Sequence, residues 1–344
     1  MNLLPLLASI FTALPGFAIA EPESAKMPFA AHGPLQVSGT HLCDQTGKPI
    51  QLRGMSTHGL QWYGWGKSLT PEALDALAND WKADILRVPL YVQEGGYQTN
   101  PKKFTEQVDT IVEEATKRGL YVLIDWHMLD PGDPMFNLER AKEYFTHITQ
   151  RHGKKGNLLY EIANEPNGTY KDGDEKKHRV DWSRIKSYAE ALIPVIRSGA
   201  PESVIIVGTP DWSSFGVSGD HGPKEVYQKP LEGKNLMYTF HFYAADHGAE
   251  YRKALDEASD KLPVFVTEWG SQEASGDGPN DFESAQAYLD LMAKKKISWT
   301  NWNYSDDHRS GAVFRPGTCP KGPWTGASLK EAGKWVRERM REPK

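Results

Sequence analysis

Two glutamates stand at the ends of apolar, β-branched stretches, where they could share one chemical task. Glu165 lies in the segment I-A-N-E-P-N (Ile162–Asn167), and Glu268 lies in F-V-T-E-W-G (Phe265–Gly270). Two carboxyl groups that face each other across a cleft are what hydrolysis of a glycosidic bond requires, because one protonates the leaving oxygen and the other attacks or stabilises the sugar cation. Lone strand-end glutamates are more often solvated or salt-bridged. We therefore treat Glu165 and Glu268 as a candidate catalytic pair whose meeting depends on the fold.

The apolar pattern predicts an α/β fold that can bring this pair together. Eight apolar runs recur along the chain, and each is followed by a charged amphipathic stretch, as in alternating strands and helices. A chain of 344 residues fits one (β/α)8 TIM barrel. An open doubly wound sheet is the alternative, but no glycine-rich phosphate turn supports it. The expected strands are Gln51–Met55, Ile85–Val88, Tyr121–Ile124, Leu158–Ile162, Val204–Val207, Met237–Phe240, Val264–Val266 and Ile297–Thr300.

Amphipathic spacing predicts seven helices between these strands. The first opens with Thr70 as the expected N-cap. The helices are expected over Pro71–Trp81, Val108–Arg118, Leu138–Gln150, Trp182–Ser198, Ala249–Ser259, Phe282–Lys294 and Leu329–Met340. Ahead of the barrel, Leu35–Val37 and Ile50–Leu52 flank an Asp-Gln-Thr-Gly turn, which predicts a short N-terminal β-hairpin covering the bottom of the barrel.

The N-terminal residues have the pattern of an export signal. An apolar run through residues 3–17 is followed by Ala-Ile-Ala, a small-residue cleavage pattern, although no Lys or Arg precedes the run. The apolar run is too short and too interrupted for a membrane anchor. We expect a signal peptide over 1–20, an N-terminal tail over 21–32 and one catalytic barrel over 33–344, in a protein secreted outside the cell or into a periplasm. In such an oxidising compartment Cys43 and Cys319 could be bonded or remain free thiols.

The composition of the chain favours a partner that is neutral or small. A net charge of -5 and the absence of a Walker or dinucleotide motif argue against nucleic acid and nucleotide ligands. Eleven tryptophans and fourteen tyrosines offer flat platforms for the apolar faces of sugar rings. We expect a monomer that binds a polysaccharide.

Candidate site residues follow the predicted strands, because active sites of TIM barrels lie at the carboxyl ends of the strands. Acids, hydrogen-bond donors and aromatic side chains alternate there. In chain order they are His58, Trp62, Arg87, Tyr91, Asp125, His127, Asn164, Glu165, Asp211, Trp212, His241, Tyr243, Glu268, Trp269 and Trp302.

The ordered set H-G-L-Q-W-Y-G, I-A-N-E-P, H-F-Y and V-T-E-W-G resembles glycoside hydrolase family 5, in particular its bacterial endo-β-1,4-glucanases. The likeness runs from about Gly33 to Met340. It implies a retaining barrel enzyme without metal or cofactor, in which Glu165 is the general acid and later base and Glu268 is the nucleophile. A retaining pair lies about 5 to 5.5 Å apart, and at that distance an ionised Glu268 favours the protonated form of Glu165.

The resemblance also suggests roles for the neighbours of the pair. Arg87 could hold Glu268 ionised, with Tyr243 as a hydroxyl donor to the same carboxylate, although an ordinary structural ion pair is the alternative for Arg87. Asn164 would donate its amide to the sugar 2-hydroxyl group. The remaining matches are expected to support the site or bind sugar. They are His127 and His241 beside the pair, His58 and Tyr91 on the glycone side, Trp302 as an aromatic floor, Trp62 and Trp212 as outer platforms, and His247 and Ala274.

One loop departs from the family pattern. After the last strand we expect a sequence such as W-S-L-S-D-K-N-E, but this chain reads W-N-Y-S-D-D-H-R. Asp307 and Arg309 therefore stand where relatives place a lysine and a glutamate, which exchanges the two charges on the glycone side.

Several other functions fit parts of the pattern. A β-mannanase, xyloglucanase, xylanase or mixed-linkage glucanase would use the same two carboxylates. A metal-dependent barrel enzyme could draw ligands from Asp125, His127, His241 and the Asp306–His308 cluster. A secreted glycan-binding barrel without activity is the remaining alternative, and the persistence of both glutamates argues against it.

Overall fold

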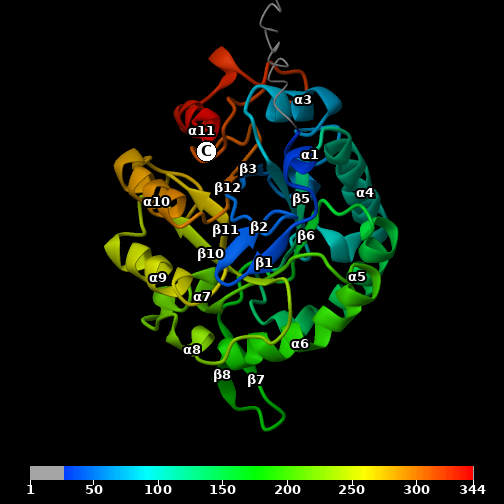
Figure 1. Cartoon of the computed structure of the whole chain (residues 1–344), viewed down its shortest axis with the longest axis vertical. Helices are drawn as coiled ribbons and strands as arrows, with labels where there is room; N and C mark the ends of the chain where they lie inside the picture. The colour runs from blue at the N-terminus through cyan, green and yellow to red at the C-terminus, as the bar shows by residue number, and fades with distance from the viewer. Residues whose placement is uncertain (1–26, 344) are drawn as a thin grey trace, which may run out of the picture.

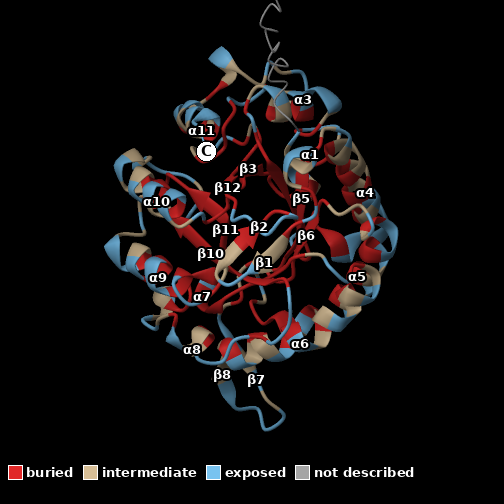
Figure 2. Cartoon of the chain, viewed as in Figure 1, coloured by how far each residue is buried: buried red, intermediate tan, exposed pale blue. Residues whose placement is uncertain are grey.

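The computed structural model describes residues 27–343 and contains a closed barrel of eight parallel strands. The strands follow one another around the barrel in chain order, each hydrogen-bonded to the next, and the last closes onto the first. Helices surround the barrel and turn their buried faces inward (Figures 1 and 2). The predicted (β/α)8 fold is confirmed. The barrel strands are β3 (Arg53–Ser56), β4 (Ile85–Tyr91), β5 (Tyr121–His127), β6 (Leu158–Glu161), β9 (Ile205–Val207), β10 (Leu236–Tyr243), β11 (Val264–Gly270) and β12 (Trp299–Trp302).

All seven expected helices are present, with differences at their ends. The N-cap prediction is correct, because the Thr70 side chain accepts a hydrogen bond from the backbone N–H of Ala73. Short helices that the pattern did not predict are α2 (Leu60–Tyr63), α7 (Pro210–Ser213) and α8 (Lys224–Tyr227). The long helices are α3 (Pro71–Asn79), α4 (Pro101–Lys117), α5 (Leu138–His152), α6 (Trp182–Gly199), α9 (Ala249–Ser259), α10 (Phe282–Lys294) and α11 (Glu331–Arg341).

The N-terminal hairpin is present, but its second strand differs from the prediction. β1 (Gln36–Ser38) pairs with β2 (His41–Cys43), whereas the segment 50–52 continues toward the barrel. Leu42, Ile50 and Leu52 all belong to the apolar cluster of the lower barrel, so burial alone did not distinguish the two candidate strands. The tight connection through Gly39 lets residues 41–43 pair directly with β1. The hairpin lies across the barrel opening in Figure 1, as expected of a bottom cover.

The N-terminal segments are only partly described. The expected signal peptide over 1–20 lies outside the described residues, as does most of the expected tail. The end of that tail forms the short helix α1 (Pro28–His32), whose Phe29 ring packs edge-on against Tyr121. Within residues 27–343, no helix combines the length and apolar character needed to cross a membrane. Cys43 and Cys319 are both free thiols.

The interior of the barrel changes from apolar to polar along each strand. In a strand, every second residue points to the same face, so Ile85 and Arg87 both point inward, as do Leu123 and Asp125. Ile85 and Leu123 belong to an apolar cluster that fills the lower barrel. Arg87 and Asp125 are completely buried one layer higher. The lower layer therefore supports a polar upper layer at the carboxyl ends of the strands.

A second short hairpin extends from the outside of the barrel. β7 (Thr169–Lys171) and β8 (Lys177–Arg179) pair antiparallel within the connection from β6 to α6. In Figure 1 this hairpin projects away from the ring of helices. The sequence pattern did not predict it, because its exposed, charged strands bury little apolar surface.

Substitution of Gly54 provides a test of the close packing in the lower barrel. A Cβ atom at Gly54 would lie 2.0 Å from the backbone oxygen of Ile85 on the neighbouring strand. We expect Gly54→Ala to destabilise the protein by about 3 kcal/mol, since overpacking against backbone cannot relax. Thermal unfolding should show a lower Tm by several degrees. Gly173→Ala is the matched control, because nothing lies within 4 Å of its added Cβ. Equal Tm values for the two variants would contradict the packing argument.

Candidate active site

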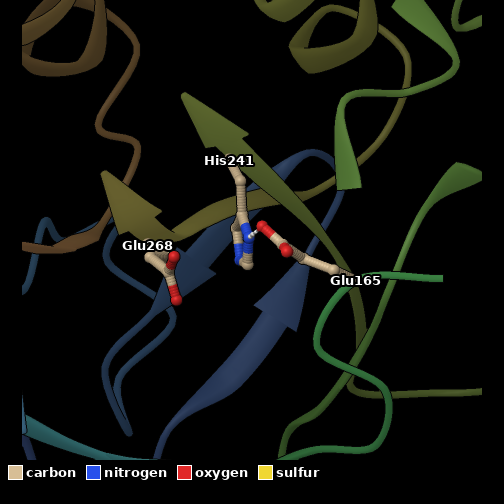
Figure 3. Close-up of side chains that lie close together, drawn as sticks. All are labelled: Glu165, His241 and Glu268. Carbon is tan, nitrogen blue, oxygen red and sulfur yellow. Dashed lines mark hydrogen bonds and ion pairs between the residues drawn. The ribbon is translucent and has the colours of Figure 1, made fainter. Parts of the chain in front are cut away.

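Glu165 and Glu268 meet at the carboxyl end of the barrel. Glu268 is located within β11, and Glu165 follows the end of β6 at Glu161. His241, from β10, lies between them, and each of the three residues offers a ligand atom within 4.8 Å of the others. Figure 3 shows both carboxylates directed toward the space around the imidazole ring. The sequence prediction that the two glutamates come together is therefore consistent with the geometry.

Arg87 is the central cation of the site and makes contacts with three carboxylates. Its Nη1 lies 2.7 Å from Oε2 of Glu268, its Nε lies 2.7 Å from Oε2 of Glu161, and its Nη2 lies 2.9 Å from Oδ2 of Asp125. Its Nη2 also donates to Oδ1 of Asn164 at 2.7 Å. The guanidinium is fully buried, so these contacts supply the hydrogen bonds that water cannot provide. Arg87 thus does more than form an ordinary ion pair, because it connects three strands beneath the candidate pair.

The environment of Glu268 favours its charged form. Burial by itself raises the pKa of this carboxyl group, but the positive charges of Arg87 and His241 outweigh burial and lower the pKa below its ordinary value. The hydroxyl group of Tyr243 donates to Oε1 of Glu268 at 2.5 Å and acts in the same direction. Glu268 is therefore an ionised carboxylate at neutral pH, as a nucleophile must be.

His241 carries a positive charge beside Glu165. Burial opposes that charge, but hydrogen bonds to Glu161 and Glu165 raise the pKa of His241 to about 9. Its Nδ1 lies 2.9 Å from Oε1 of Glu165, and its Nε2 lies 2.8 Å from the hydroxyl oxygen of Thr267. Both ring nitrogens can donate in the protonated ring. His241 therefore orients the Glu165 carboxyl group through its Nδ1.

A shift of strand register lets two consecutive residues of β11 face the interior. Thr239 pairs with Phe265, whereas His241 pairs with Glu268, so β11 contains one residue more than β10 over this stretch. Thr267 donates to Glu161 at 2.7 Å, and Glu268 contacts Arg87. In a regular strand these neighbours would point to opposite faces. β-Bulges are frequent next to active sites for this reason.

Glu161 and Thr267 are site residues that the sequence analysis missed. Glu161 was treated as part of an apolar strand, but it is fully buried and has its pKa lowered to about 2, because Arg87 and His241 outweigh the effect of burial. A charged residue inside an apolar run must have a buried partner, and that signal could have identified it. Asp125 lies in the same layer, where burial raises its pKa to about 6 despite Arg87 and His127.

A cavity of about 630 Å³ lies over the candidate pair. Most of the predicted sugar-binding residues line it. Arg87 and Asn164 are buried beneath it, where the Asn164 oxygen accepts from Arg87 and its Nδ2 donates to the Met128 carbonyl oxygen at 3.4 Å. The predicted residues on the cavity wall are His58, Trp62, Tyr91, His127, Glu165, Trp212, His241, Tyr243, His247, Glu268, Ala274, Trp302, Asp307 and Arg309.

Aromatic rings form most of one end of this cavity. Tyr91 stacks on His127 with ring centres 4.0 Å apart, and His127 lies nearly parallel to Trp302. Trp62 meets Tyr91 edge-on and is 43% exposed. Trp212 is 45% exposed and follows β9, which is four strands from β3 in the eight-stranded barrel. The two exposed tryptophans therefore stand at opposite ends of the cavity.

His247 is prepared to donate a hydrogen bond. Its Nδ1 accepts from the backbone N–H of Tyr243 at 2.9 Å, and burial lowers its pKa to about 4. The ring is therefore neutral at neutral pH with its proton on Nε2. It stacks on Tyr251 with centres 3.9 Å apart, so its orientation is fixed in the cavity wall.

The exchanged charges after β12 form a pair within the loop. Arg309 Nη1 lies 3.3 Å from Asp307 Oδ2, and the Tyr63 hydroxyl donates to Asp307 Oδ1 at 2.9 Å. Burial raises the pKa of Asp307, but the hydrogen bond from Tyr63 and nearby His58 lower it overall. The loop thus presents a charged pair at the end of the cavity near Trp62.

The chemistry of the donor set disfavours a metal. Among residues 27–343, Glu165, His241 and Glu268 are the group with ligand spacing. A protonated histidine cannot ligate a cation, and Arg87 already balances Glu268. Asp125 and His127 are paired with each other at 2.6 Å. A metal at this group would have to displace the proton of His241 and compete with Arg87 for Glu268.

A barrel with two facing carboxylates, one held ionised by a buried arginine, defines a hydrolase of the glycosidase type. The chain matches the family model described as Cellulase (glycosyl hydrolase family 5) over residues 43–308. The chain belongs to glycosyl hydrolase family 5.

Individual relatives agree with this assignment. The chain is 57% identical over 314 residues to endoglucanase E-5 of Thermobifida fusca and 55% identical over 315 residues to endoglucanase MaCel5A of a Microbulbifer species. Each alignment covers 91% of this chain, but only 65% and 59% of the two relatives. The chain thus spans less than two thirds of the length of these two curated relatives. The crystal structure of the catalytic domain of T. fusca endoglucanase Cel5A, in complex with cellotetraose, superposes with a TM-score of 0.87 at 56% identity. That superposition covers 92% of this chain and 100% of the other.

Glu161 provides a test of the buried charge layer. We expect Glu161→Gln to destabilise the protein by about 3 kcal/mol at neutral pH, because Arg87 loses a buried partner. The folded-state pKa of Glu161 is about 2, below its ordinary 4.5, so its charge stabilises the protein above pH 4.5 and this contribution is lost as pH falls toward 2. Urea unfolding as a function of pH should show the wild type and the variant converging over that interval.

The control for this measurement is Glu202→Gln, which removes an ion pair with Lys234 on the exposed surface. Surface pairs contribute about 0.5 kcal/mol or less, so this variant should be nearly as stable as the wild type. A gap between wild type and Glu161→Gln that stays constant from neutral pH to pH 2 would refute the electrostatic explanation.

Proposed function

We propose that the protein is a secreted, monomeric, retaining endo-β-1,4-glucanase that cleaves within a glucan chain lying across the open cavity. The observation that carries the proposal is the approach of Glu165, His241 and Glu268 within 4.8 Å at the carboxyl end of the barrel. An inverting enzyme needs a larger separation of about 6.5 to 9.5 Å, since a water molecule must fit between sugar and base. The cellotetraose bound by the related T. fusca domain supports a β-1,4-glucan as substrate.

In the first step, Glu268 attacks the anomeric carbon while Glu165 gives its proton to the leaving oxygen. Arg87 and Tyr243 hold Glu268 ionised and oriented before the attack. The bond from the anomeric carbon to the leaving oxygen breaks, and an ester to Glu268 forms. The electron pair of the broken bond remains on the leaving oxygen, which the proton from Glu165 neutralises.

In the second step, the ester is hydrolysed with the same two residues. Esterification removes the negative charge of Glu268, while His241 remains positive 2.9 Å from Glu165. The ionised form of Glu165 is then favoured, so Glu165 can take a proton from water as a general base. Water attacks the anomeric carbon on the face opposite Glu268, and the configuration of the released sugar is retained.

Other β-glycans are the second candidate substrates. The pair Asp307–Arg309 lines the end of the cavity near Trp62, and this loop is the segment expected to depart from the family pattern, so substrate preference there can differ. β-Mannan, xyloglucan, xylan and mixed-linkage glucan therefore belong in the same assay as carboxymethylcellulose. Secretion is proposed from the N-terminal apolar segment alone.

Substitution of each glutamate tests the catalytic assignment. We expect Glu165→Gln and Glu268→Gln to abolish the fall in viscosity of carboxymethylcellulose, with losses of about 10³-fold or more. On cellobiosyl fluoride, whose leaving group needs no proton, Glu165→Gln should still form the glycosyl-enzyme, detected by intact mass. Glu268→Gln should not. Full activity of either variant on carboxymethylcellulose would exclude the two-glutamate mechanism.

The stereochemistry of the product tests the retaining mechanism independently. Proton NMR recorded during the first minutes of cellohexaose hydrolysis should show the β-anomer before mutarotation, because two displacements at one carbon restore its configuration. An initial α-anomer would identify an inverting enzyme and exclude a covalent role for Glu268.

A further inference from the structure

The connection after β9 holds Trp212 in an unusual backbone conformation. Asp211, Trp212, Ser213 and Phe215 have φ values of 57°, 59°, 55° and 56°, all in the left-handed region that non-glycine residues seldom adopt. Such conformations persist only where the surrounding structure enforces them, and they cluster at functional sites. This connection also has no long helix, since only α7 and α8 occur between β9 and β10 apart from a single 3-10 turn. The position of the exposed indole therefore depends on the contacts that this connection makes with neighbouring segments.

On its inner side, the connection is bonded to the segment that carries Glu165. The backbone N–H of Trp212 donates to the carbonyl oxygen of Pro166 at 3.1 Å. The hydroxyl group of Ser213 donates to the carbonyl oxygen of Asn164 at 2.6 Å. A general acid must lie beside the leaving oxygen, so the leaving sugar lies on the side of the cavity where Trp212 stands.

On its outer side, the connection is held by Arg179 of the β7–β8 hairpin. Arg179 Nη2 lies 3.2 Å from Oδ2 of Asp211, the residue before Trp212, and 2.5 Å from Oε1 of Glu225 in α8. The Asp211 side chain is only 8% exposed, so it is shielded from competing water. Arg179 thus connects both short helices, α7 and α8, to the β7–β8 hairpin, which is an addition to the eight strands and helices of the barrel.

The hairpin itself is anchored to the body of the protein. The guanidinium of Arg184 in α6 lies over the Tyr170 ring of β7, 4.0 Å from its centre. Arg184 is in turn paired with Asp133 at 2.8 Å. The hairpin that contains Arg179 is therefore fixed to the rest of the protein. Because the hairpin is fixed, Arg179 can restrain the connection after β9.

We propose that Arg179 is a positioning residue that keeps Trp212 in place to stack on the leaving-side sugar, acting through Asp211. The role rests on the proposed glucanase function and deepens it. Arg179 forms no bond in the reaction and lies outside the set of residues that line the cavity. Its Nη2 lies near both carboxylates, and its Nε also donates to Oδ1 of Asp211 at 3.4 Å, so two nitrogens of one planar group face Asp211. The single ammonium group of lysine reproduces this arrangement poorly.

A comparison of two substrates distinguishes a positioning role of Arg179 from a general loss of activity. Cellohexaose occupies the leaving side of the cavity, whereas the leaving group of cellotriosyl fluoride is a single fluoride that cannot stack on Trp212. We expect Arg179→Ala to lower kcat/KM for cellohexaose about tenfold, mainly through KM, as for loss of one aromatic contact. The value for cellotriosyl fluoride should be unchanged. Arg179→Lys should show a smaller loss with the same substrate selectivity.

A double-mutant cycle tests whether Arg179 acts through Trp212. In a Trp212→Ala background, Arg179→Ala should cause no further loss on cellohexaose, because the contact it supports is already absent. An equal loss in both backgrounds would overturn the proposal. The control is Arg118→Ala, which removes an arginine also paired with two carboxylates, Asp75 and Glu114, between α3 and the end of α4. It should leave both substrates unaffected.

The remaining outcomes are also decisive. If the unmodified protein hydrolyses neither substrate, the proposed function fails and the positioning role fails with it. If the unmodified protein hydrolyses both and Arg179→Ala matches it on cellohexaose, the proposed function stands and only the positioning role is overturned. Should Arg179→Ala fold poorly by circular dichroism, Arg179→Lys carries the same comparison.

Discussion

The buried guanidinium of Arg87 is the interaction on which the rest of the site depends. An isolated charge in the interior is costly, and Arg87 is acceptable there only because Glu161, Asp125 and Glu268 surround it. The converse also holds, since three carboxylates could not be buried together without a cation. The barrel brings these partners together because β4, β5 and β6 are adjacent and β11 faces them across the interior. Stability and chemistry therefore rely on the same set of charges.

The two glutamates of the candidate pair differ because their neighbours differ. Glu268 is held by a permanent cation and a phenol hydroxyl group, which favour its ionised form. Glu165 is more exposed and is oriented by His241, which is bonded on its other side to Thr267. The proposed double displacement requires these two parts, a fixed anion and an oriented acid. The division of roles thus follows from which strand each glutamate occupies.

At the carboxyl end of the barrel, the two glutamates and the charged residues around them are held by strands or strand ends. The cavity walls around them are partly formed by less regular segments. Tyr91, His127 and Trp302 are held by strands or strand ends and stack on one another at the end of the cavity near Trp62. Trp212, at the other end, belongs to a connection without a long helix, and its backbone requires support from outside the barrel. The charged pair Asp307–Arg309 likewise lies in a loop. Substrate preference is therefore expected to vary with the loops, while the chemistry stays with the strands.

The sequence by itself determined the barrel and most of the site. Eight apolar runs with amphipathic stretches between them are specific for alternating strands and helices, and the residues ending those runs must gather at one face. Glu165, Glu268, Arg87, His241 and Tyr243 could be found in this way. The charge of Glu161 inside an apolar run signalled a buried partner, but only the tertiary structure identified that partner as Arg87. Thr267 left no such signal, because the bulge in β11 turns it inward beside Glu268. The second strand of the N-terminal hairpin, the β7–β8 hairpin and its contact with Asp211 were also decided by the tertiary structure. Short, exposed elements carry little periodic signal, and contacts between residues distant in sequence leave no local pattern.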